Sequence, residues 1–352
     1  MMPSVNDIER FAFIVGAPRC GTTTLANFLK AHPDVCFPVV KEPHFFARHD
    51  LTALTVPELR KEIEAEYLAR FFPHCSTKQF GADCSVSYLY TPEQLEPVLR
   101  LWPESRFVVT LRDPMEMLPS LHKRLVFLGD ETLTHFKDAW AAVSDRAAGK
   151  RIPRSCVEPR WLRYDQAGRY ATYLERLFAT VGREQCLVLL FDDLVADPIC
   201  QYRRLVNFLG LAAMERTIDL APRRESHDVR VAWLQRLLKR PPKPVRKYMA
   251  GPHYRNRERK LSGDLADSGA FDKVFALRKR VLKWNRIPPR KEAIPLSVQE
   301  DMRRHLKGEI ERLENLIGRD LGHWLQLQPE RQTAGSRAST PVRPRPSFSA
   351  AK

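Results

Sequence analysis

The sequence predicts an α/β fold in which a central parallel sheet is flanked by helices. Three observations lead to this prediction. The chain has 352 residues, of which 43% are hydrophobic, so it can bury a sizeable core. Over its first two thirds, short β-type runs alternate with helix-like segments. The first of these runs ends at a glycine-containing turn that leads directly into a helix, which is typical of such folds.

The expected elements of the first two thirds follow one another as strands separated by helices. In order, we expect a strand at 11–17, a helix at 22–31, a short strand at 34–39, an amphipathic helix at 58–72, the segment FGADCSVSYLY at 80–90, a helix at 92–101, a strand at 106–111, a helix after Pro114, a helix at 167–181 and a strand at 186–191. This order favours a parallel sheet with helices on both faces. Ligands of such sheets bind at the carboxyl ends of the strands.

The last third is expected to be mostly helical. Helices are expected at 231–240 and within 296–325, where Leu306, Ile310 and Leu313 have the spacing of a helix packed on a core. The segment at 240–260 is basic and rich in proline, which indicates a surface loop or insertion. We therefore divide the chain into a lead at 1–10, one large domain at 11–328 and a disordered basic tail at 329–352.

Cysteine usage and the N-terminus suggest a soluble, cytoplasmic protein. The seven cysteines are scattered and include no C-x-x-C pair, so we expect reduced, mostly buried thiols and no metal site. The first apolar run is too short to cross a bilayer or to form the core of a signal peptide. No feature of the sequence indicates an oligomeric state.

The net charge of +16 is concentrated in one segment. Residues 222–291 contain 21 Lys or Arg and 6 Asp or Glu, so the rest of the chain is nearly neutral. Such a segment is either a solvated surface or a region that attracts an anionic partner.

The turn after the first strand has the features of a phosphate site. The stretch GAPRCGTTT follows the strand, and its backbone N–H groups lie at the positive end of the dipole of the next helix. Gly16 and Gly21 would let the backbone approach a ligand, Arg19 adds a positive charge, and the hydroxyls of the threonines add donors. The spacing is that of a Walker A loop, but Thr22 stands where that motif requires lysine.

With the cation upstream at Arg19, the loop resembles that of sulfotransferases that use 3′-phosphoadenosine 5′-phosphosulfate (PAPS). The resemblance implies that the 5′-phosphosulfate is bound by Arg19, Cys20, Gly21, Thr22, Thr23 and Thr24. The stretch RFVVTLRDPMEMLPS resembles the 3′-phosphate motif of the same family, with Arg112 at a strand end and Ser120 eight positions later. A planar guanidinium and a helix hydroxyl suit a phosphate.

Further similarity extends over most of the chain, through VLLFDDLVADP and LENLIGRDLGHWL. The pattern is most similar to the carbohydrate sulfotransferases of the heparan-sulfate type and their bacterial relatives. The resemblance implies a metal-independent enzyme that moves the sulfuryl group of PAPS to a hydroxyl or amine, leaving the 3′,5′-bisphosphate PAP. The acceptor would be a glycan or a glycosylated small molecule, and an anionic one would suit the basic segment.

The resemblance also implies catalytic roles. The segment KEPHFF places Glu42 as the general base, with His44 as its rival, while Arg19 would neutralise charge on the leaving bisphosphate. Desolvation beside phenylalanines would keep Glu42 effective as a base. Lys41 could assist at the phosphosulfate, and Arg230 is the expected contact of a C-terminal loop with the 3′-phosphate.

Two departures from the family pattern put the acceptor in doubt. The sequence has Asp83-Cys84 where the heparan-type enzymes have an acidic residue followed by lysine, and Asp83 would then orient the acceptor. Met117 occupies a position often filled by arginine.

Two other interpretations stay open at this point. One is an ATP-dependent kinase that uses the loop at 16–23, against which stand the missing Walker lysine and the pairing of Arg112 with Ser120. The other is a protein that binds nucleic acid or another polyanion without catalysis, for which binding would weaken steeply with salt. We expect no specific nucleic-acid partner.

Overall fold

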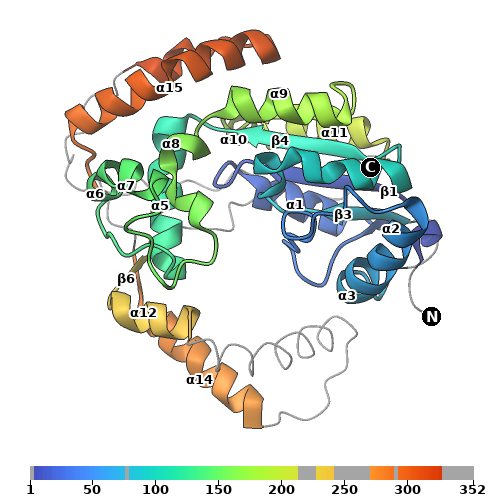
Figure 1. Ribbon diagram of the computed structural model, residues 1–352, viewed down its shortest axis with the longest axis horizontal. Helices are drawn as coiled ribbons and strands as arrows, with labels where there is room; N and C mark the ends of the chain where they lie inside the picture. Colours follow the sequence, from blue (N-terminus) through green and yellow to red (C-terminus); the bar gives the residue numbers. More distant parts are fainter. Residues whose placement is uncertain (1–3, 76–78, 213–226, 242–269, 289–291, 327–352) are drawn as a thin grey trace, which may run out of the picture.

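The computed structural model describes residues 4–75, 79–212, 227–241, 270–288 and 292–326. Its centre is a five-stranded parallel sheet with the strand order β2-β3-β1-β4-β5 (Figure 1), so the predicted α/β class is confirmed. A separate pair of short strands, β6 and β7, is antiparallel. The strands are β1 (Ile8–Gly16), β2 (Val35–Cys36), β3 (Gln79–Asp83), β4 (Arg106–Leu111), β5 (Cys186–Leu190), β6 (Asp228–Val229) and β7 (Arg286–Ile287).

Helices surround the sheet and form the C-terminal part of the molecule (Figure 1). They are α1 (Thr22–Ala31), α2 (Val56–Glu62), α3 (Ala69–Phe71), α4 (Glu96–Leu101), α5 (Pro114–Leu128), α6 (Phe136–Ala141), α7 (Val143–Ala147), α8 (Tyr164–Ala167), α9 (Tyr170–Val181), α10 (Phe191–Ala196), α11 (Pro198–Leu209), α12 (Ala232–Lys239), α14 (Ala270–Trp284) and α15 (Leu296–Ile317). A π-helical segment, Ile63–Leu68, joins α2 to α3, and the predicted helix at 58–72 corresponds to this composite.

The side chains of β1 alternate between the two faces of the sheet and contribute to a hydrophobic core on each face. Successive side chains of a strand point to opposite faces. Phe11, Phe13 and Val15 pack into the larger core, which includes residues of α5, α9 and α15. Ala12 and Ile14 pack into a second core with α1 and α11. Both faces are therefore covered, as parallel sheets require.

The connections between strands bring two motif-bearing turns together. The chain leaves β1 toward β2 at one edge of the sheet, whereas β4 continues to β5 at the other edge. The carboxyl ends of β1 and β4 are neighbours, and the backbone N–H of Ala17 donates to the carbonyl of Thr110 over 2.8 Å. Crevices at such points are where α/β sheets bind ligands.

A smaller unit is formed by β6, β7, α12 and α14. The buried residue Asn285 holds this unit together. Its side-chain Oδ1 accepts a hydrogen bond from the N–H of Val231 over 2.8 Å, and its backbone carbonyl accepts one from the N–H of Arg230 over 2.9 Å. In Figure 1, α12 and α14 lie at the side of the molecule opposite α15.

Some predicted boundaries of helices and strands agree with the structure, and others differ. The helix at 22–31 and the strand at 106–111 are confirmed to the residue. Strand β1 begins at Ile8, inside the stretch that the sequence suggested as a lead. Most of the basic segment at 240–260 and the tail at 329–352 lie outside the described residues. No helix within the described ranges is long and apolar enough to cross a bilayer.

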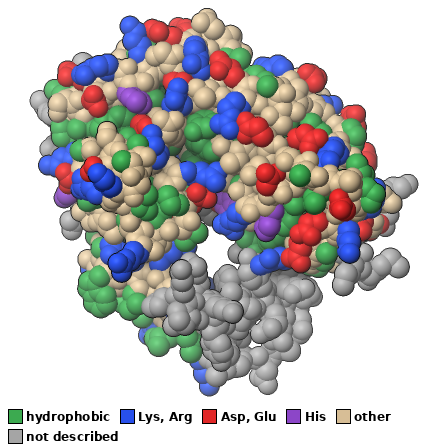
Figure 2. All heavy atoms as spheres, viewed as in Figure 1, with side chains coloured by type: hydrophobic (Ala, Val, Ile, Leu, Met, Phe, Trp, Pro, Cys, Tyr) green, Lys and Arg blue, Asp and Glu red, His purple; other side chains and the backbone are tan. Residues whose placement is uncertain are grey.

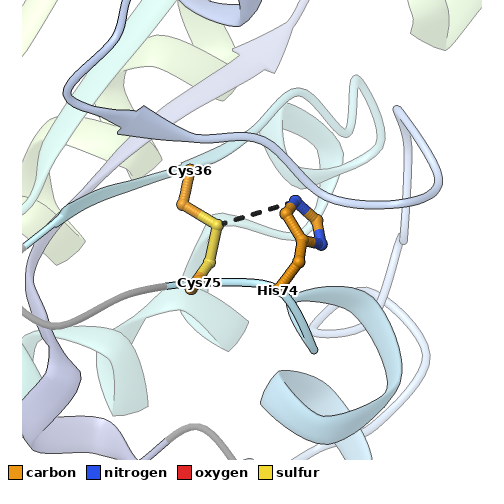
Figure 3. The surroundings of a disulfide bond; sticks show 3 residues. All are labelled: Cys36, His74 and Cys75. Atoms are coloured by element: carbon orange, nitrogen blue, oxygen red, sulfur yellow. Dashed lines mark hydrogen bonds between the residues drawn. A yellow bond between two sulfur atoms is a disulfide. The ribbon is translucent and has the colours of Figure 1, made fainter. Parts of the chain in front are cut away.

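One prediction about the cysteines is wrong. Cys36 at the end of β2 and Cys75 after α3 form a disulfide, with their Cα atoms 5.6 Å apart (Figure 3). The sequence places them 39 residues apart, and only the packing of α3 beside β2 brings them within bonding reach. The other five cysteines are free thiols, and only Cys200 among them is exposed.

Candidate active site

A cavity of about 400 Å³ opens at the carboxyl ends of β1 and β4 and combines the two motifs. A volume of this size is in the range of small-ligand sites. Its wall includes nine of the residues that the sequence singled out: Arg19, Gly21, Thr22, Thr23, Thr24, Glu42, His44, Arg112 and Ser120. These residues come from four separate segments, and the sheet order explains why they meet.

Direct contact links the first motif to the second. The Nε of Arg19 donates to the hydroxyl of Ser120 over 3.0 Å, although 101 residues separate the two. Arg19 has a φ of 64° and Gly21 a φ of 88°, so the loop is tightly curved where it enters α1. A non-glycine residue with positive φ is uncommon and often lies at a functional site.

Both glycines of the loop lie close against side chains of other elements. At Gly21, a Cβ would lie 2.8 Å from Leu194, and at Gly16 it would lie 2.8 Å from Leu89. Gly16 is absent from the cavity wall within the described residues, so its lack of a side chain accommodates Leu89 rather than a ligand. Cys20 also points inward: its thiol is fully buried and donates to the carbonyl of Pro18, and burial raises its pKa to about 12.

The N-terminus of α1 supplies hydrogen-bond donors to the cavity. Thr22, Thr23 and Thr24 form its first turn, and no side chain caps the helix at Gly21. The first N–H groups of a helix have no partner within the helix and lie at the positive end of its dipole. This end of the cavity therefore suits an anion.

Arg112 directly follows β4 and faces the same cavity. Its Nε donates to Oε2 of Glu116 over 3.0 Å, and its guanidinium carbon lies 4.6 Å from the ring centre of Phe191. Glu116 is on the first turn of α5, so the guanidinium is held between a helix and an aromatic ring. A phosphate that binds Arg112 would share it with the Glu116 carboxylate or displace that carboxylate.

Glu42 and His44 form a pair on the cavity wall. The Nε2 of His44 is 3.5 Å from Oε2 of Glu42, and the Nζ of Lys41 is 2.6 Å from Oε1. Burial alone would raise the pKa of Glu42, but the hydrogen bond from His44 and the charge of Lys41 outweigh it, so this pKa is lowered. The desolvation expected from the neighbouring phenylalanines is therefore outweighed by the contacts with His44 and Lys41.

A buried network holds His44 in place. His44 has a φ of 55°, its N–H donates to the hydroxyl of Ser85 over 2.8 Å, and its Nδ1 is 2.7 Å from the hydroxyl of Ser87. The Ser85 hydroxyl donates in turn to Asp83 over 2.6 Å. These bonds fix the imidazole between Ser87 and Glu42.

Asp83 does not orient an acceptor as the sequence suggested. Its carboxylate is completely buried and accepts hydrogen bonds from the hydroxyls of Tyr67, Tyr88 and Ser85. Burial raises the pKa of Asp83, while these donors oppose the rise. Asp83 is therefore linked to the site through the hydroxyl of Ser85. Met117 is likewise a core residue.

The residues that line the cavity outside the motifs have mixed charge and include a large aromatic ring. Trp161, Arg124, Glu158 and Arg240 line the cavity, and Arg240 is anchored by Asp130, with Nε donating to Oδ1 over 2.8 Å. The sequence did not identify these residues as part of the site. The sequence identified Arg240 as the first residue of a basic segment. Its neighbours in the chain do not indicate that it packs beside α5.

Arg230 lies away from this cavity. Its guanidinium carbon is 4.9 Å from the ring centre of Trp284, and it lines a second cavity beside the outer side of α5. The bond between its N–H and Asn285 ties this part of the chain to the end of α14. The structure therefore brings Arg240, not Arg230, to the residues of the two motifs. No group of three or more potential metal ligands occurs in the described part of the chain.

Comparison with known proteins adds a family assignment. The model of the sulfotransferase family matches residues 12–215. Heparan sulfate glucosamine 3-O-sulfotransferase 3B1 of Mus musculus is 28% identical over 205 residues, which cover 57% of this chain and 46% of the relative. Carbohydrate sulfotransferase 15 of Mus musculus is 24% identical over 254 residues, with 57% and 44% covered. The chain thus spans about half the length of the curated relatives that it matches.

One solved structure covers nearly the whole chain. A sulfotransferase from Alicyclobacillus acidocaldarius superposes with a TM-score of 0.56 at 22% identity and covers 90% of this chain and 98% of its own. At this level of identity the similarity shows a shared fold.

Proposed function

Because this chain belongs to the sulfotransferase family, we propose that it transfers the sulfuryl group of PAPS to a hydroxyl or amine of a carbohydrate-containing acceptor. The observation that carries the proposal is the contact between Arg19 and Ser120 in a cavity that Arg112 also lines. Two sites for anions, one from each motif, are thereby joined in one pocket, as a nucleotide with phosphates at both ends of its ribose requires.

The residues present fit this co-substrate. The first motif would hold the 5′-phosphosulfate through Arg19, the threonines and the N-terminus of α1. The second would hold the 3′-phosphate through Arg112 and Ser120. Cationic and hydroxyl donors dominate both positions. Glu116 is the exception, and it orients the guanidinium of Arg112.

The transfer would break the S–O bond to the 5′-phosphate and form an S–O bond to an acceptor hydroxyl or an S–N bond to an acceptor amine. The proton of the acceptor goes to a base, and the leaving bisphosphate gains a negative charge. Arg19 and the helix N-terminus stabilise that charge, since fixed donors stabilise developing charge without reorganising. A base is required on the opposite side of the sulfur.

Glu42 is our proposed base, with His44 as its partner. The contact of 3.5 Å between them supports this arrangement, because an imidazole beside the carboxylate can orient it and relay its proton. The lowered pKa of Glu42 keeps it ionised and ready to accept a proton, at the cost of some basicity. His44 as the base, oriented by Glu42, is the alternative that the mutants below separate.

A carbohydrate acceptor is supported by the other residues that line the cavity. Trp161 offers an aromatic face, and Arg124 and Arg240 offer donors for hydroxyl or acidic groups. The relatives named above are described as acting on heparan sulfate glucosamine or carbohydrate. An anionic sugar would suit the two arginines.

Calorimetric titration with PAP and with ATP tests the nucleotide assignment. We expect PAP to bind much more tightly than ATP, and Arg112→Ala to weaken PAP binding by about 10- to 100-fold because a charge-assisted contact is lost. The matched control is Arg230→Ala, which removes the same side chain from the other cavity and should leave PAP binding unchanged. Tighter binding of ATP than of PAP would refute the assignment.

A screen with radiolabelled PAPS then identifies the acceptor. Acidic and neutral oligosaccharides and small glycosides are compared for transfer of label, and Arg240→Ala should raise KM for acidic acceptors only. Transfer to non-carbohydrate acceptors alone would contradict the proposed acceptor class without affecting the PAP result.

A further inference from the structure

The unit formed by α12 and α14 exposes large apolar side chains. Trp233 and Leu237 on α12 are 66% and 50% exposed, and Val274, Leu277 and Trp284 on α14 are 55%, 64% and 53% exposed. Half of the large hydrophobic residues that are strongly exposed in the described chain therefore belong to these two short helices. Clustered exposure of this kind marks an interaction surface rather than scattered surface residues.

The exposed residues form a stripe on each helix. Val274, Leu277 and Trp284, together with the partly exposed Val281, are spaced by three and four residues and so lie on one face of α14. The buried Leu282 lies on a different face. On α12, Trp233 and Leu237 are four residues apart and share a face.

The two helices contact each other, so the stripes belong to one unit. The Nε of Arg278 donates to the carbonyl of Leu238 over 2.9 Å. Asn285, which follows α14, accepts from Val231 and donates to Gln235 over 3.1 Å. Figure 2 shows apolar side chains with basic ones beside them over α12, at the lower left.

Positive charge surrounds these apolar residues. Residues 232–239 and 270–287 contain eight Lys or Arg and one Asp. Four of the cations on α14 are exposed, and Lys273 and Arg280 border the apolar stripe. Burial, together with Arg278, Arg124 and other neighbouring arginines, lowers the pKa of Lys239 to about 8. Neighbouring arginines thus add to the effect of burial at Lys239, which reflects the excess of positive charge in this unit.

We propose that the α12–α14 unit docks on the surface of a bilayer that contains anionic lipids. Cations beside an exposed stripe of Trp, Leu and Val match a surface with anionic headgroups above an apolar interior. A soluble polyanion would satisfy the cations but would leave the apolar stripe in water. The contact would be peripheral, with the apolar stripes of the two helices facing the bilayer surface.

Vesicle sedimentation with the full chain tests this inference. We expect binding to vesicles of equal parts phosphatidylcholine and phosphatidylserine, no binding to phosphatidylcholine alone, and weakening by salt. Leu237→Ser with Leu277→Ser should reduce binding by about tenfold, because two apolar side chains no longer leave water. The matched control is Val195→Ser with Ile199→Ser, which are 64% and 52% exposed elsewhere and should not change binding.

Fluorescence quenching adds a readout that needs no variant. Trp233 and Trp284 are exposed, whereas Trp102, Trp140 and Trp324 are buried. Lipids with brominated chains should therefore quench the native protein's fluorescence on binding. Three outcomes would each overturn the proposal. The fluorescence of the vesicle-bound protein stays unquenched, the double leucine variant binds vesicles like the parent, or the protein binds heparin but not vesicles. PAP affinity of the variants, measured in parallel, reports on folding and is independent of this outcome.

Discussion

Glu42 shows how a few neighbouring charges decide a residue's chemistry. Its side chain is 32% exposed, and burial on its own would favour the protonated form. Contacts with His44 and Lys41 reverse this and lower its pKa below the usual glutamate range. Glu42 therefore stays ionised as the pH falls through the range in which an ordinary glutamate is protonated.

Exchange of Glu42 for glutamine should separate the two candidate bases. Glu42→Gln should bind PAP normally and lower kcat by about 100-fold or more, because general base catalysis is lost. The pH profile of kcat/KM of the parent should stay level down to pH values below the ordinary glutamate pKa of about 4.3. Initial rates with labelled PAPS measure both quantities.

Glu93 provides a matched control for this exchange. Glu93→Gln removes a surface carboxylate that pairs with Arg176 and should leave kcat unchanged. If the acid limb of the parent instead lies near the ordinary histidine pKa of about 6.5, and Glu42→Gln retains substantial turnover, then His44 is the base.

At the scale of elements, the turn after β3 supports the catalytic pair. β3 ends at Asp83, whose buried carboxylate accepts from Ser85, and Ser85 accepts from the backbone of His44. The chain can hold His44 at positive φ because these bonds compensate for the strain. The β3 turn thus positions the pair of Glu42 and His44 through its hydrogen bonds to His44.

Replacement of Ser85 by alanine tests this positioning role. Ser85→Ala should lower kcat by about tenfold while the Kd for PAP stays constant, since Ser85 is not among the described residues that line the cavity. It should also lower the free energy of unfolding by about 1–2 kcal/mol, because Asp83 and the His44 N–H lose a partner. Turnover, PAP titration and urea unfolding measure the three effects.

Ser105 offers a matched control for that variant. Its hydroxyl is fully buried just before β4 and has no hydrogen-bond partner within the described residues. Ser105→Ala should leave both kcat and the free energy of unfolding nearly unchanged. A fall in PAP affinity with Ser85→Ala would show that the β3 turn shapes the nucleotide site instead.

At the scale of the whole molecule, the disulfide links β2 at the sheet edge to the segment after α3. Closing a loop between residues 39 apart restricts the unfolded chain. Disulfides persist mainly in oxidising compartments. The cytoplasmic location expected from the sequence stays a prediction, and this disulfide is the feature that opposes it.

Reduction should measurably destabilise the protein. In the chain-entropy account, a loop of this length contributes about 4 kcal/mol to the free energy of unfolding. Urea unfolding with and without dithiothreitol should show a loss of that order. Cys200→Ser removes an exposed free thiol and should leave the difference intact. Identical unfolding curves under both conditions would mean that Cys36 and Cys75 are not bonded in solution.

The sequence alone predicted the fold class and the two phosphate motifs of one nucleotide. Thr22–Ala31 and the strand at 106–111 could be assigned because helix and strand patterns depend on neighbours in the chain. Arg19 and Arg112 were expected to bind the two ends of one nucleotide because each follows a strand of one parallel sheet. The shared cavity and the bond between Arg19 and Ser120 agree with that expectation.

Only the tertiary structure decided the features that depend on residues distant in the chain. The disulfide, the choice of Arg240 over Arg230 at the cavity, and the burial of Asp83 each follow from how separate elements pack. The tertiary structure also decided the direction of the Glu42 pKa shift. Burial and neighbouring charges oppose each other at this carboxylate, and their balance depends on distances that the sequence does not specify.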